Sequence, residues 1–143
     1  MGQCCAQLCR QSREEEGNIP GSSELAGGNV HLVTDVDNWE EIISQANKNA
    51  QIVVVNFSAS WCNPCRIAAP AYRDLADKYT SVKFLTVDVD NLAEFSNSWD
   101  IKATPTFIFL KEGRQMDRLV GGSKQELEKR ILSMVESSVA TPR

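Results

Sequence analysis

Residues Ile52 to Cys65 read Ile-Val-Val-Val-Asn-Phe-Ser-Ala-Ser-Trp-Cys-Asn-Pro-Cys. The segment 52–58 predicts a buried strand, because four consecutive aliphatic residues precede an aromatic one and neither Gly nor Pro interrupts them. Beyond Pro64, apolar residues recur at helical spacing and predict one buried helix face. They are Ile67, Ala68, Ala71, Leu75, Ala76 and Tyr79. Cys62 is therefore expected where the strand has ended and the helix begins, with Pro64 in the first turn.

The cysteine pair at this junction predicts a redox site. The free N–H groups and the positive dipole end of a helix N-terminus favour an anion, and a thiolate is an anion. Cys62 is thus the expected nucleophile. Cys65 lies about one turn further on, where it is shielded and can act as the resolving thiol that closes a disulfide.

Two other roles of a C-x-x-C pair, zinc binding and a structural disulfide, are less consistent with the sequence. Zinc needs about four ligands, and the remaining candidates are Cys4, Cys5, Cys9 and the single His31, none of them in a second half-site. A purely structural disulfide across so short a loop would gain little from chain entropy. We therefore expect neither a metal nor a bound cofactor.

Composition predicts one soluble globular domain. The chain has 143 residues, of which 42% are hydrophobic and 24% charged. A net charge of −4 without a basic stripe argues against nucleic acid as a partner. No apolar run approaches the roughly 20 residues of a membrane span, and the first 28 residues lack the apolar core of a secretory signal. Five cysteines in such a chain indicate thiols in a reducing, cytoplasmic environment, and we expect a monomer.

Strand and helix patterns alternate along the chain. Strands are expected at 30–34, 52–58 and 82–88, and a hairpin at 106–110 and 115–120 turns across Glu112-Gly113. Asp37, with Glu40 three residues on, predicts the start of a first helix, and Ser123 with Glu126 that of the last, which would bury Leu127, Ile131 and Val135. A short helix is expected at 92–99. This order predicts an α/β fold.

The chain resembles the thioredoxins over about residues 28–135, and most of all the plant h-type. The residues that carry the resemblance occur in the family's order and spacing. They are Phe57-Ser58-Ala59-Ser60-Trp61-Cys62-Asn63-Pro64-Cys65, Pro70, Val87-Asp88-Val89-Asp90, Ala103-Thr104-Pro105-Thr106, Lys111-Glu112-Gly113 and Val120-Gly121-Gly122.

The resemblance implies a thioredoxin fold, with a central mixed sheet of about five strands flanked by helices on both faces and Pro105 in cis. It implies a protein-disulfide reductase that acts on disulfide-containing target proteins. The implied surface for these targets surrounds the cysteine pair and binds an extended segment. It consists of Trp61, Asn63, Pro64, Thr104, Pro105 and Gly121.

Three positions depart from the family pattern. Asn56 stands where most thioredoxins have a buried aspartate, and Thr86 stands where a lysine commonly pairs with it. The joint loss is physically coherent, because losing one member alone would leave an unpaired buried charge. An amide cannot accept a proton at neutral pH, so Cys65 must lose its proton to water or to Cys62. Asn63 replaces the usual glycine and is expected to alter the first turn.

The first 28 residues differ from the rest and predict a flexible extension, followed by a thioredoxin domain at 29–137 and a tail at 138–143. Gly2, Cys4 and Cys5 form a candidate acylation signal, although Ala6 replaces the usual Ser or Thr. Acylation would place the protein at the plasma membrane or endomembranes. Extended h-type members also imply that Cys4 is a third redox cysteine, used in reduction by glutathione and glutaredoxin rather than by thioredoxin reductase.

Two alternative functions remain open on the sequence. An oxidase or isomerase is disfavoured because Pro64 stands where isomerases usually have His. A membrane-tethered adaptor of weak redox activity would use the thioredoxin surface for docking only, and the presence of both Cys62 and Cys65 argues against it.

Overall fold

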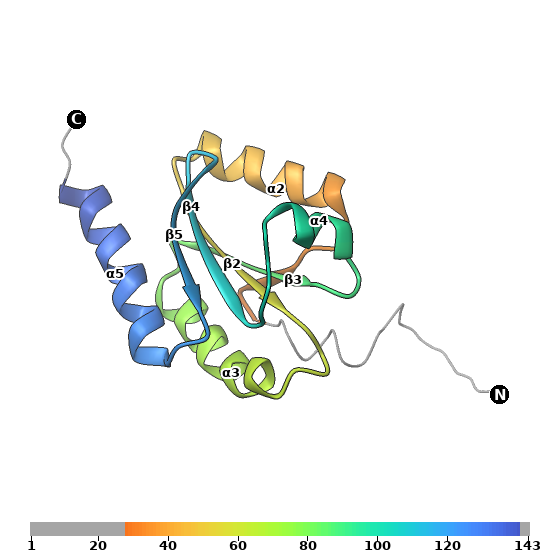
Figure 1. Cartoon of the computed structure of the whole chain (residues 1–143). Coiled ribbons are helices and arrows are strands. Elements are labelled where there is room, and N and C mark those ends of the chain that lie inside the picture. Colours follow the sequence, from red (N-terminus) through yellow and green to blue (C-terminus); the bar gives the residue numbers. More distant parts are fainter. Residues whose placement is uncertain (1–27, 141–143) are drawn as a thin grey trace.

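A computed structural model describes residues 28–140, in which a five-stranded mixed sheet lies between two layers of helices (Figure 1). The elements in chain order are β1 (Val30–Leu32), α2 (Val36–Lys48), β2 (Ile52–Ser58), α3 (Asn63–Lys78), β3 (Lys83–Asp88), α4 (Ala93–Ser98), β4 (Thr106–Lys111), β5 (Arg114–Val120) and α5 (Lys124–Ala140). Within this range no helix is both long enough and apolar enough to cross a membrane.

The strands are ordered β1-β3-β2-β4-β5 across the sheet. β1, β3 and β2 run parallel, whereas β4 is antiparallel to β2 and forms a hairpin with β5. The central strand β2 is buried along its whole length, which explains its unbroken run of apolar residues. The predicted thioredoxin fold, with a mixed sheet and helices on both faces, is confirmed.

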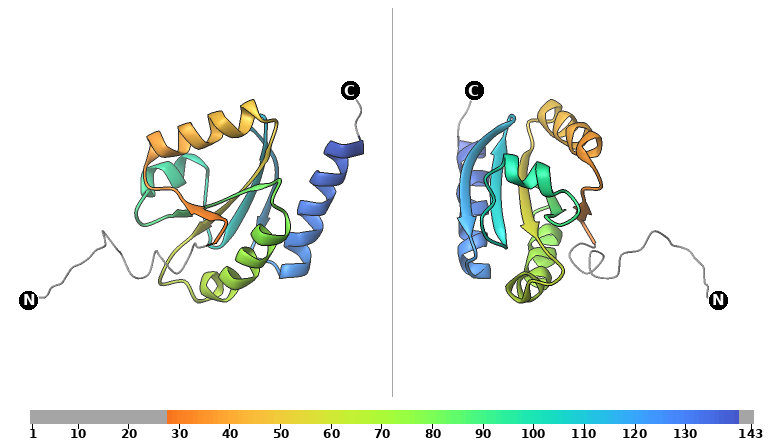
Figure 2. Two further views of the ribbon diagram at one scale, coloured as in Figure 1. Left: turned by 180° about the vertical axis from the view of Figure 1, so that it is seen from behind. Right: turned by 45° about the vertical axis from the view of Figure 1, so that its right-hand side comes forward.

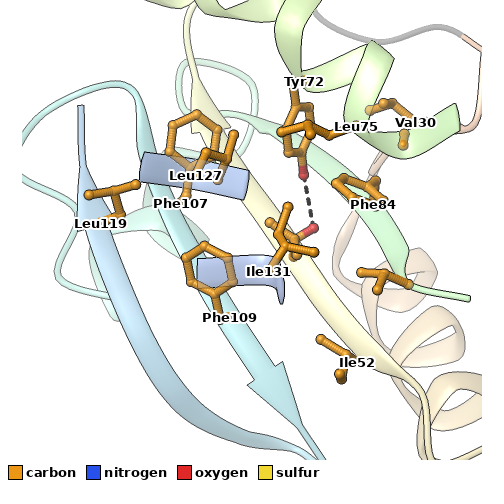
Figure 3. Close-up of a cluster of buried hydrophobic side chains, with 13 residues drawn as sticks. Val30, Ile52, Tyr72, Leu75, Phe84, Phe107, Phe109, Leu119, Leu127 and Ile131 are labelled. Atoms are coloured by element: carbon orange, nitrogen blue, oxygen red, sulfur yellow. Dashed lines mark hydrogen bonds between the residues drawn. The ribbon is translucent and has the colours of Figure 1, made fainter. Parts of the chain in front are cut away.

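Helices cover both faces of the sheet (Figure 2), and each face carries its own apolar core. α3 and α5 cover one face, where Tyr72 packs among Leu75, Phe84 and Phe107 (Figure 3). The buried Tyr72 hydroxyl donates a hydrogen bond shared between the carbonyl oxygens of Val54 (2.9 Å) and Leu85 (2.6 Å). This bond fastens the middle of α3 to β2 and β3.

α2 and α4 cover the other face, which is rich in aromatic rings. Trp39 of α2 lies edge-on to Phe95 and Trp99, with ring centroids 5.0 and 5.6 Å apart. Phe57 of β2 completes this cluster. The rings hold the short helix α4 against the sheet, beside the loop that leads to Thr104.

The start of the first helix differs from the prediction. α2 is capped by Asp35, whose carboxylate accepts a hydrogen bond of 2.7 Å from the Asn38 backbone N–H. Asp37 lies inside the first turn instead, so the proposed capping box of Asp37 and Glu40 is wrong. Asp35 has the extended backbone that an N-cap requires, with φ −160° and ψ 177°. At the last helix the prediction holds, since the Ser123 hydroxyl accepts from the Glu126 N–H (3.2 Å).

The buried face of α3 also differs in part from the prediction. Ile67 is 71% exposed, whereas Ala69 and Tyr72 are buried. The buried stripe contains Cys65, Ala69, Tyr72, Leu75 and Ala76. It starts from Cys65 and repeats at intervals of three and four residues, which leaves Ile67 on the outer surface.

The described chain begins at the far end of α3. The Asn29 side-chain amide donates to the Asp77 carboxylate (3.1 Å) and lies 3.4 Å from the Ala76 carbonyl oxygen. Both acceptors belong to the last turns of α3, whereas Cys62 precedes its first turn. Asn29, near the start of the described chain, and the cysteine pair therefore lie at opposite ends of α3.

Candidate active site

Cys62 is the N-cap residue of α3. Its backbone is extended, and its sulfur accepts a hydrogen bond from the Cys65 backbone N–H at 3.3 Å. Pro64 lies in the first turn, where its missing N–H costs nothing. The sulfur thus occupies the position in which a side-chain acceptor satisfies a free helix N–H, as the sequence predicted.

Cys65 lies one turn further into the protein. It is fully buried, whereas Cys62 retains 5% of its surface. The Cys65 thiol donates a hydrogen bond to the Cys62 sulfur, with the two sulfur atoms 2.6 Å apart. A proton can therefore pass between the two side chains without movement of the helix. Oxidation can likewise join the two sulfur atoms in a disulfide.

The two thiols are inequivalent in acidity. Burial acts to raise the pKa of Cys62, but hydrogen bonds with the Cys65 thiol, Thr104 and the Cys65 backbone N–H outweigh it, and the pKa is lowered. Burial raises the pKa of Cys65. The hydrogen bond that the Cys65 thiol donates to the Cys62 sulfur raises the pKa of Cys65 further, because this bond holds the proton on Cys65. Near neutral pH this arrangement favours a thiolate on Cys62 and a thiol on Cys65.

The loop before β4 approaches the pair from the opposite side. The Thr104–Pro105 peptide bond is cis, as the family resemblance implied. The carbonyl oxygen of Thr104 lies 3.5 Å from the Cys62 sulfur. Gly121, with φ 68°, donates its N–H to the Pro105 carbonyl oxygen at 2.8 Å. Residues distant in the sequence therefore meet around Cys62.

Shallow grooves flank the exposed edge of this site. One, of about 240 Å³, lies between Trp61 and Thr104 and extends along Ile101. The other, of about 380 Å³, is lined by Pro64, Ile67 and Gly122 among others. Their apolar walls suit the side chains of an extended peptide.

Trp61 is held in place by a residue to which the sequence had assigned no role. The ring is 68% exposed, and its indole N–H donates to the Asp90 carboxylate at 2.6 Å. Asp90 ends the Val87-Asp88-Val89-Asp90 stretch, so an acidic residue directly after a strand was the available signal. Ile67 was missed as a surface residue because its hydrophobicity suggested the core. Asn63 is exposed in the first turn of α3.

Asn56 and Thr86 are neighbours on adjacent strands, as their replacement of a charge pair suggested. They are register partners of β2 and β3, and both are at most 1% exposed. Neither the amide nitrogen nor the amide oxygen of Asn56 has a hydrogen-bond partner among the described residues. β2 and β3 therefore place two buried polar side chains side by side, with no charge at position 56.

The structure brings Trp61, Cys62, Cys65, Thr104, Pro105 and Gly121 to one end of the sheet. The candidate residues Gly2, Cys4 and Cys5 lie outside the described residues, as do most of the extension and the tail. Within residues 28–140, no group of three or more His, Cys, Asp or Glu side chains is arranged to hold a metal ion.

This fold and thiol pair define a protein-disulfide oxidoreductase of the thioredoxin class. A sequence model of the family described as Thioredoxin matches residues 30–133, and the chain belongs to that family.

Its relatives place it with the plant h-type thioredoxins. Thioredoxin H4-1 of Oryza sativa is 47% identical over 138 residues, which is 96% of this chain and 100% of the relative. Thioredoxin H9 of Arabidopsis thaliana is 51% identical over 120 residues, covering 84% and 86% of the two chains. The crystal structure of a poplar wild-type thioredoxin h shares 50% identity at a TM-score of 0.74 and covers 76% of this chain and 98% of that one.

Proposed function

We propose that this chain reduces disulfides of target proteins with Cys62 as the attacking thiolate and Cys65 as the resolving thiol. One observation carries the proposal. Cys62 is the N-cap of α3 with a lowered pKa, while the buried Cys65 beside it has a raised pKa. Only the first is primed to attack near neutral pH.

The reaction has two balanced steps. The Cys62 thiolate attacks one sulfur of a target disulfide, forms a mixed disulfide and releases the other target sulfur as a thiolate. Cys65 then loses its proton and attacks the Cys62 sulfur. The Cys62–Cys65 disulfide forms, the second target sulfur leaves, and two electrons have passed to the target.

Binding would use the surface around the pair. An extended target segment lies beside cis-Pro105 and forms backbone hydrogen bonds with that loop, while its side chains enter the grooves next to Trp61 and Pro64. Thr104 and Gly121 support the same loop, and the exposed Asn63 follows Cys62 in the first turn of α3. The exposed tryptophan and the two apolar grooves support this proposal.

The roles of the two cysteines can be distinguished by trapping. Cys62→Ser should abolish disulfide reduction, and Cys65→Ser should accumulate mixed disulfides with its targets, detected by non-reducing electrophoresis and mass spectrometry. Multi-turnover reduction of insulin by the Cys65→Ser protein, together with trapping by Cys62→Ser, would reverse the assignment.

We further propose that the chain belongs to the h-type subgroup with an N-terminal extension and that Cys4 passes electrons from glutathione and glutaredoxin to the Cys62–Cys65 disulfide. The reach is sufficient. α3 has 16 residues and spans about 24 Å between its ends. The 24 residues from Cys4 to Gly28 can extend to about 80 Å. Thioredoxin reductase is the alternative donor.

A second role proposed for the extension is membrane attachment. A myristoyl chain on Gly2 gives only marginal binding, so a palmitoyl chain on Cys4 or Cys5 would be required as well. An acylated Cys4 has no free thiol. If both roles operate in one molecule, Cys5 must therefore carry the lipid while Cys4 remains reduced. The protein would then divide between the cytoplasm and membranes.

A further inference from the structure

We propose that Ser58 and Asp88 form the path by which Cys65 loses its proton in the resolving step, with the Asp88 carboxylate as the final acceptor. This inference rests on the proposed roles of Cys62 and Cys65. It answers the problem posed by Asn56, whose amide cannot serve as a base.

Ser58 and Asp88 lie on the face of the sheet that α3 covers. Val54 packs in the core under α3, whereas Val53, Val55 and Phe57 pack in the opposite core. Side chains alternate along a strand, so Ser58 lies on the α3 side. The same alternation in β3, where Phe84 lies in the core under α3 and Leu85 and Val87 in the other, places Asp88 on the α3 side as well.

Ser58 and Asp88 are also register partners on the adjacent strands β2 and β3. Asn56 and Thr86 form the corresponding pair two residues earlier on each strand. Partners on adjacent strands are about 4.8 Å apart and their side chains leave the same face. The Ser58 hydroxyl has no hydrogen-bond partner of good geometry among the described residues, so it is not bonded directly to Asp88, and one water molecule is placed between the hydroxyl and the carboxylate.

Ser58 has a buried hydroxyl beside Cys65. Its side chain is fully buried, and its hydroxyl has no hydrogen-bond partner of good geometry among the described residues. It nevertheless lies close enough to the Cys65 sulfur to counteract part of the effect of burial on the pKa of that thiol. Buried hydroxyls are seldom left unsatisfied. A hydroxyl both donates and accepts, which is what a proton relay requires.

Asp88 is suited to be the acceptor. It is 6% exposed, so it borders both the protein interior and the solvent. One carboxylate oxygen accepts the Asp90 N–H at 3.0 Å, which orients the group. A carboxylate has about four acceptor sites, so this bond leaves capacity for a proton-carrying water.

In the resolving step, the Cys65 proton passes to the Ser58 oxygen. At the same time the Ser58 proton passes through the bridging water to the Asp88 carboxylate. The Cys65 thiolate attacks the Cys62 sulfur of the mixed disulfide, and the target sulfur departs with the electron pair of the broken bond. Asp88 finally releases the proton to solvent.

Other titratable groups near Cys65 do not fill this role. Cys62 is covalently occupied in the mixed disulfide. The Asp90 carboxylate accepts the Trp61 N–H on the outer side. Arg66 follows Cys65 on α3 as an exposed cation, and the loop before β4 contributes the neutral Thr104.

The test separates the two chemical steps in the full chain, with Cys4, Cys5 and Cys9 changed to Ser. A symmetrical aromatic disulfide that releases coloured nitrothiobenzoate gives one stopped-flow phase for attack by Cys62 and a second for resolution by Cys65. Asp88→Asn keeps an oxygen for the Asp90 N–H but cannot take a proton. The matched control Asp37→Asn makes the same change of charge at an exposed site in α2.

Asp88→Asn should leave the first phase unchanged and slow the second at least about tenfold at neutral pH, within the usual range for general-base effects. Its second phase should rise about tenfold per pH unit, because it then depends on free thiolate. The parent should show a much weaker pH dependence, because its second phase draws on the Cys65 thiol through the acceptor and not only on free thiolate. Ser58→Ala should behave like Asp88→Asn. Asn56→Asp added to Asp88→Asn should restore the flat profile.

Equal second-phase rates and pH slopes in Asp88→Asn and Asp37→Asn would overturn the proposal. Should Asp88→Asn not fold, an unaltered second phase in Ser58→Ala overturns it equally. Failure of the proposed function looks different, because the parent protein itself would then show no second phase.

Discussion

A single turn of helix gives two identical side chains opposite chemical tendencies. Cys62 accepts hydrogen bonds that stabilise its thiolate, whereas the complete burial of Cys65 penalises a charge on its sulfur. The difference needs no cofactor or neighbouring cation. It follows from the N-cap position of one sulfur and the burial of the other.

This asymmetry predicts a pH dependence. Because the pKa of Cys62 is lowered, its alkylation by iodoacetamide should reach half of its maximal rate at a lower pH than that of a model thiol. Cys65 should remain unmodified throughout. Peptide mapping by mass spectrometry over a pH series measures both. Modification of Cys62 that follows the profile of free cysteine would contradict the proposed environment.

Asn56 allows a second prediction at the same scale. Asn56→Asp should accelerate resolution by Cys65 about tenfold near neutral pH, because it supplies a second carboxylate base, in addition to Asp88, on the α3 side of β2. The buried charge should lower the free energy of unfolding, and Thr86→Lys on the adjacent strand should partly restore it. Stopped-flow kinetics and urea denaturation separate the two effects. A folded Asn56→Asp protein with an unchanged resolution rate would contradict the first.

At the scale of elements, the helix caps determine where each helix meets the sheet. The sequence pattern predicted Asp37 as the cap of α2, whereas Asp35, two residues earlier, is the residue that accepts the helix N–H. Such a choice depends on the path of the preceding chain, which follows β1, and local spacing does not encode that path.

The two aspartates can be compared directly. Asp35→Ala should lower the free energy of unfolding by about 1 kcal/mol, the usual cost of removing an N-cap acceptor. Asp37→Ala removes only a charge near the helix dipole and should cost about 0.3 kcal/mol. Urea unfolding of both variants decides between the caps, and a larger loss for Asp37→Ala would restore the capping box.

Sequence patterns predicted the strands well and the helix faces less well. The strands were found because β-branched and aromatic runs are bounded by turn residues. The predicted buried face of α3 was partly wrong, because the alanines at 68, 69, 71 and 76 fit several faces of the helix. Tyr72, which is buried, was not assigned to any face. The C-x-x-C pair was predictable from a local motif, whereas the cis form of Pro105 was implied only by the resemblance to the thioredoxins. The Trp61–Asp90 bond and the Ser58–Asp88 pairing were not, because they arise from the register of strands distant in sequence.

At the scale of the whole molecule, the question is how the extension and the domain work together. Cys4 lies 24 residues before Gly28, and the span of α3 is short compared with the extended length of that segment. The cost of closing such a loop grows only slowly with its length. An intramolecular electron transfer is therefore sterically accessible.

Cys4→Ser should remove turnover supported by glutathione and glutaredoxin while leaving reduction by dithiothreitol intact. Cys9→Ser is the matched control, since it removes a thiol from the same segment. Insulin reduction with each donor system measures the effect. Normal glutathione-dependent turnover in Cys4→Ser would leave the extension without an electron-passing role.

Gly2→Ala should abolish N-acylation and move the protein to the soluble fraction, because myristoylation requires the glycine. The reduction of insulin by dithiothreitol should not change. Fractionation of cells that express each form, with intact-mass analysis, provides the measurement. An unmodified Gly2 in the wild-type protein would remove the anchoring proposal and leave the redox chemistry untouched.

The bond from Asn29 to the end of α3 fixes the place at which the described domain joins the chain before it. That place lies a full helix length from the reactive sulfur. A short tether attached directly at residue 28 would hold the domain by the end opposite to Cys62, so Trp61 and the grooves would face away from the support. The same geometry suits immobilisation on a sensor or a fusion to a cargo domain, since either attachment leaves the reactive face open to incoming substrates.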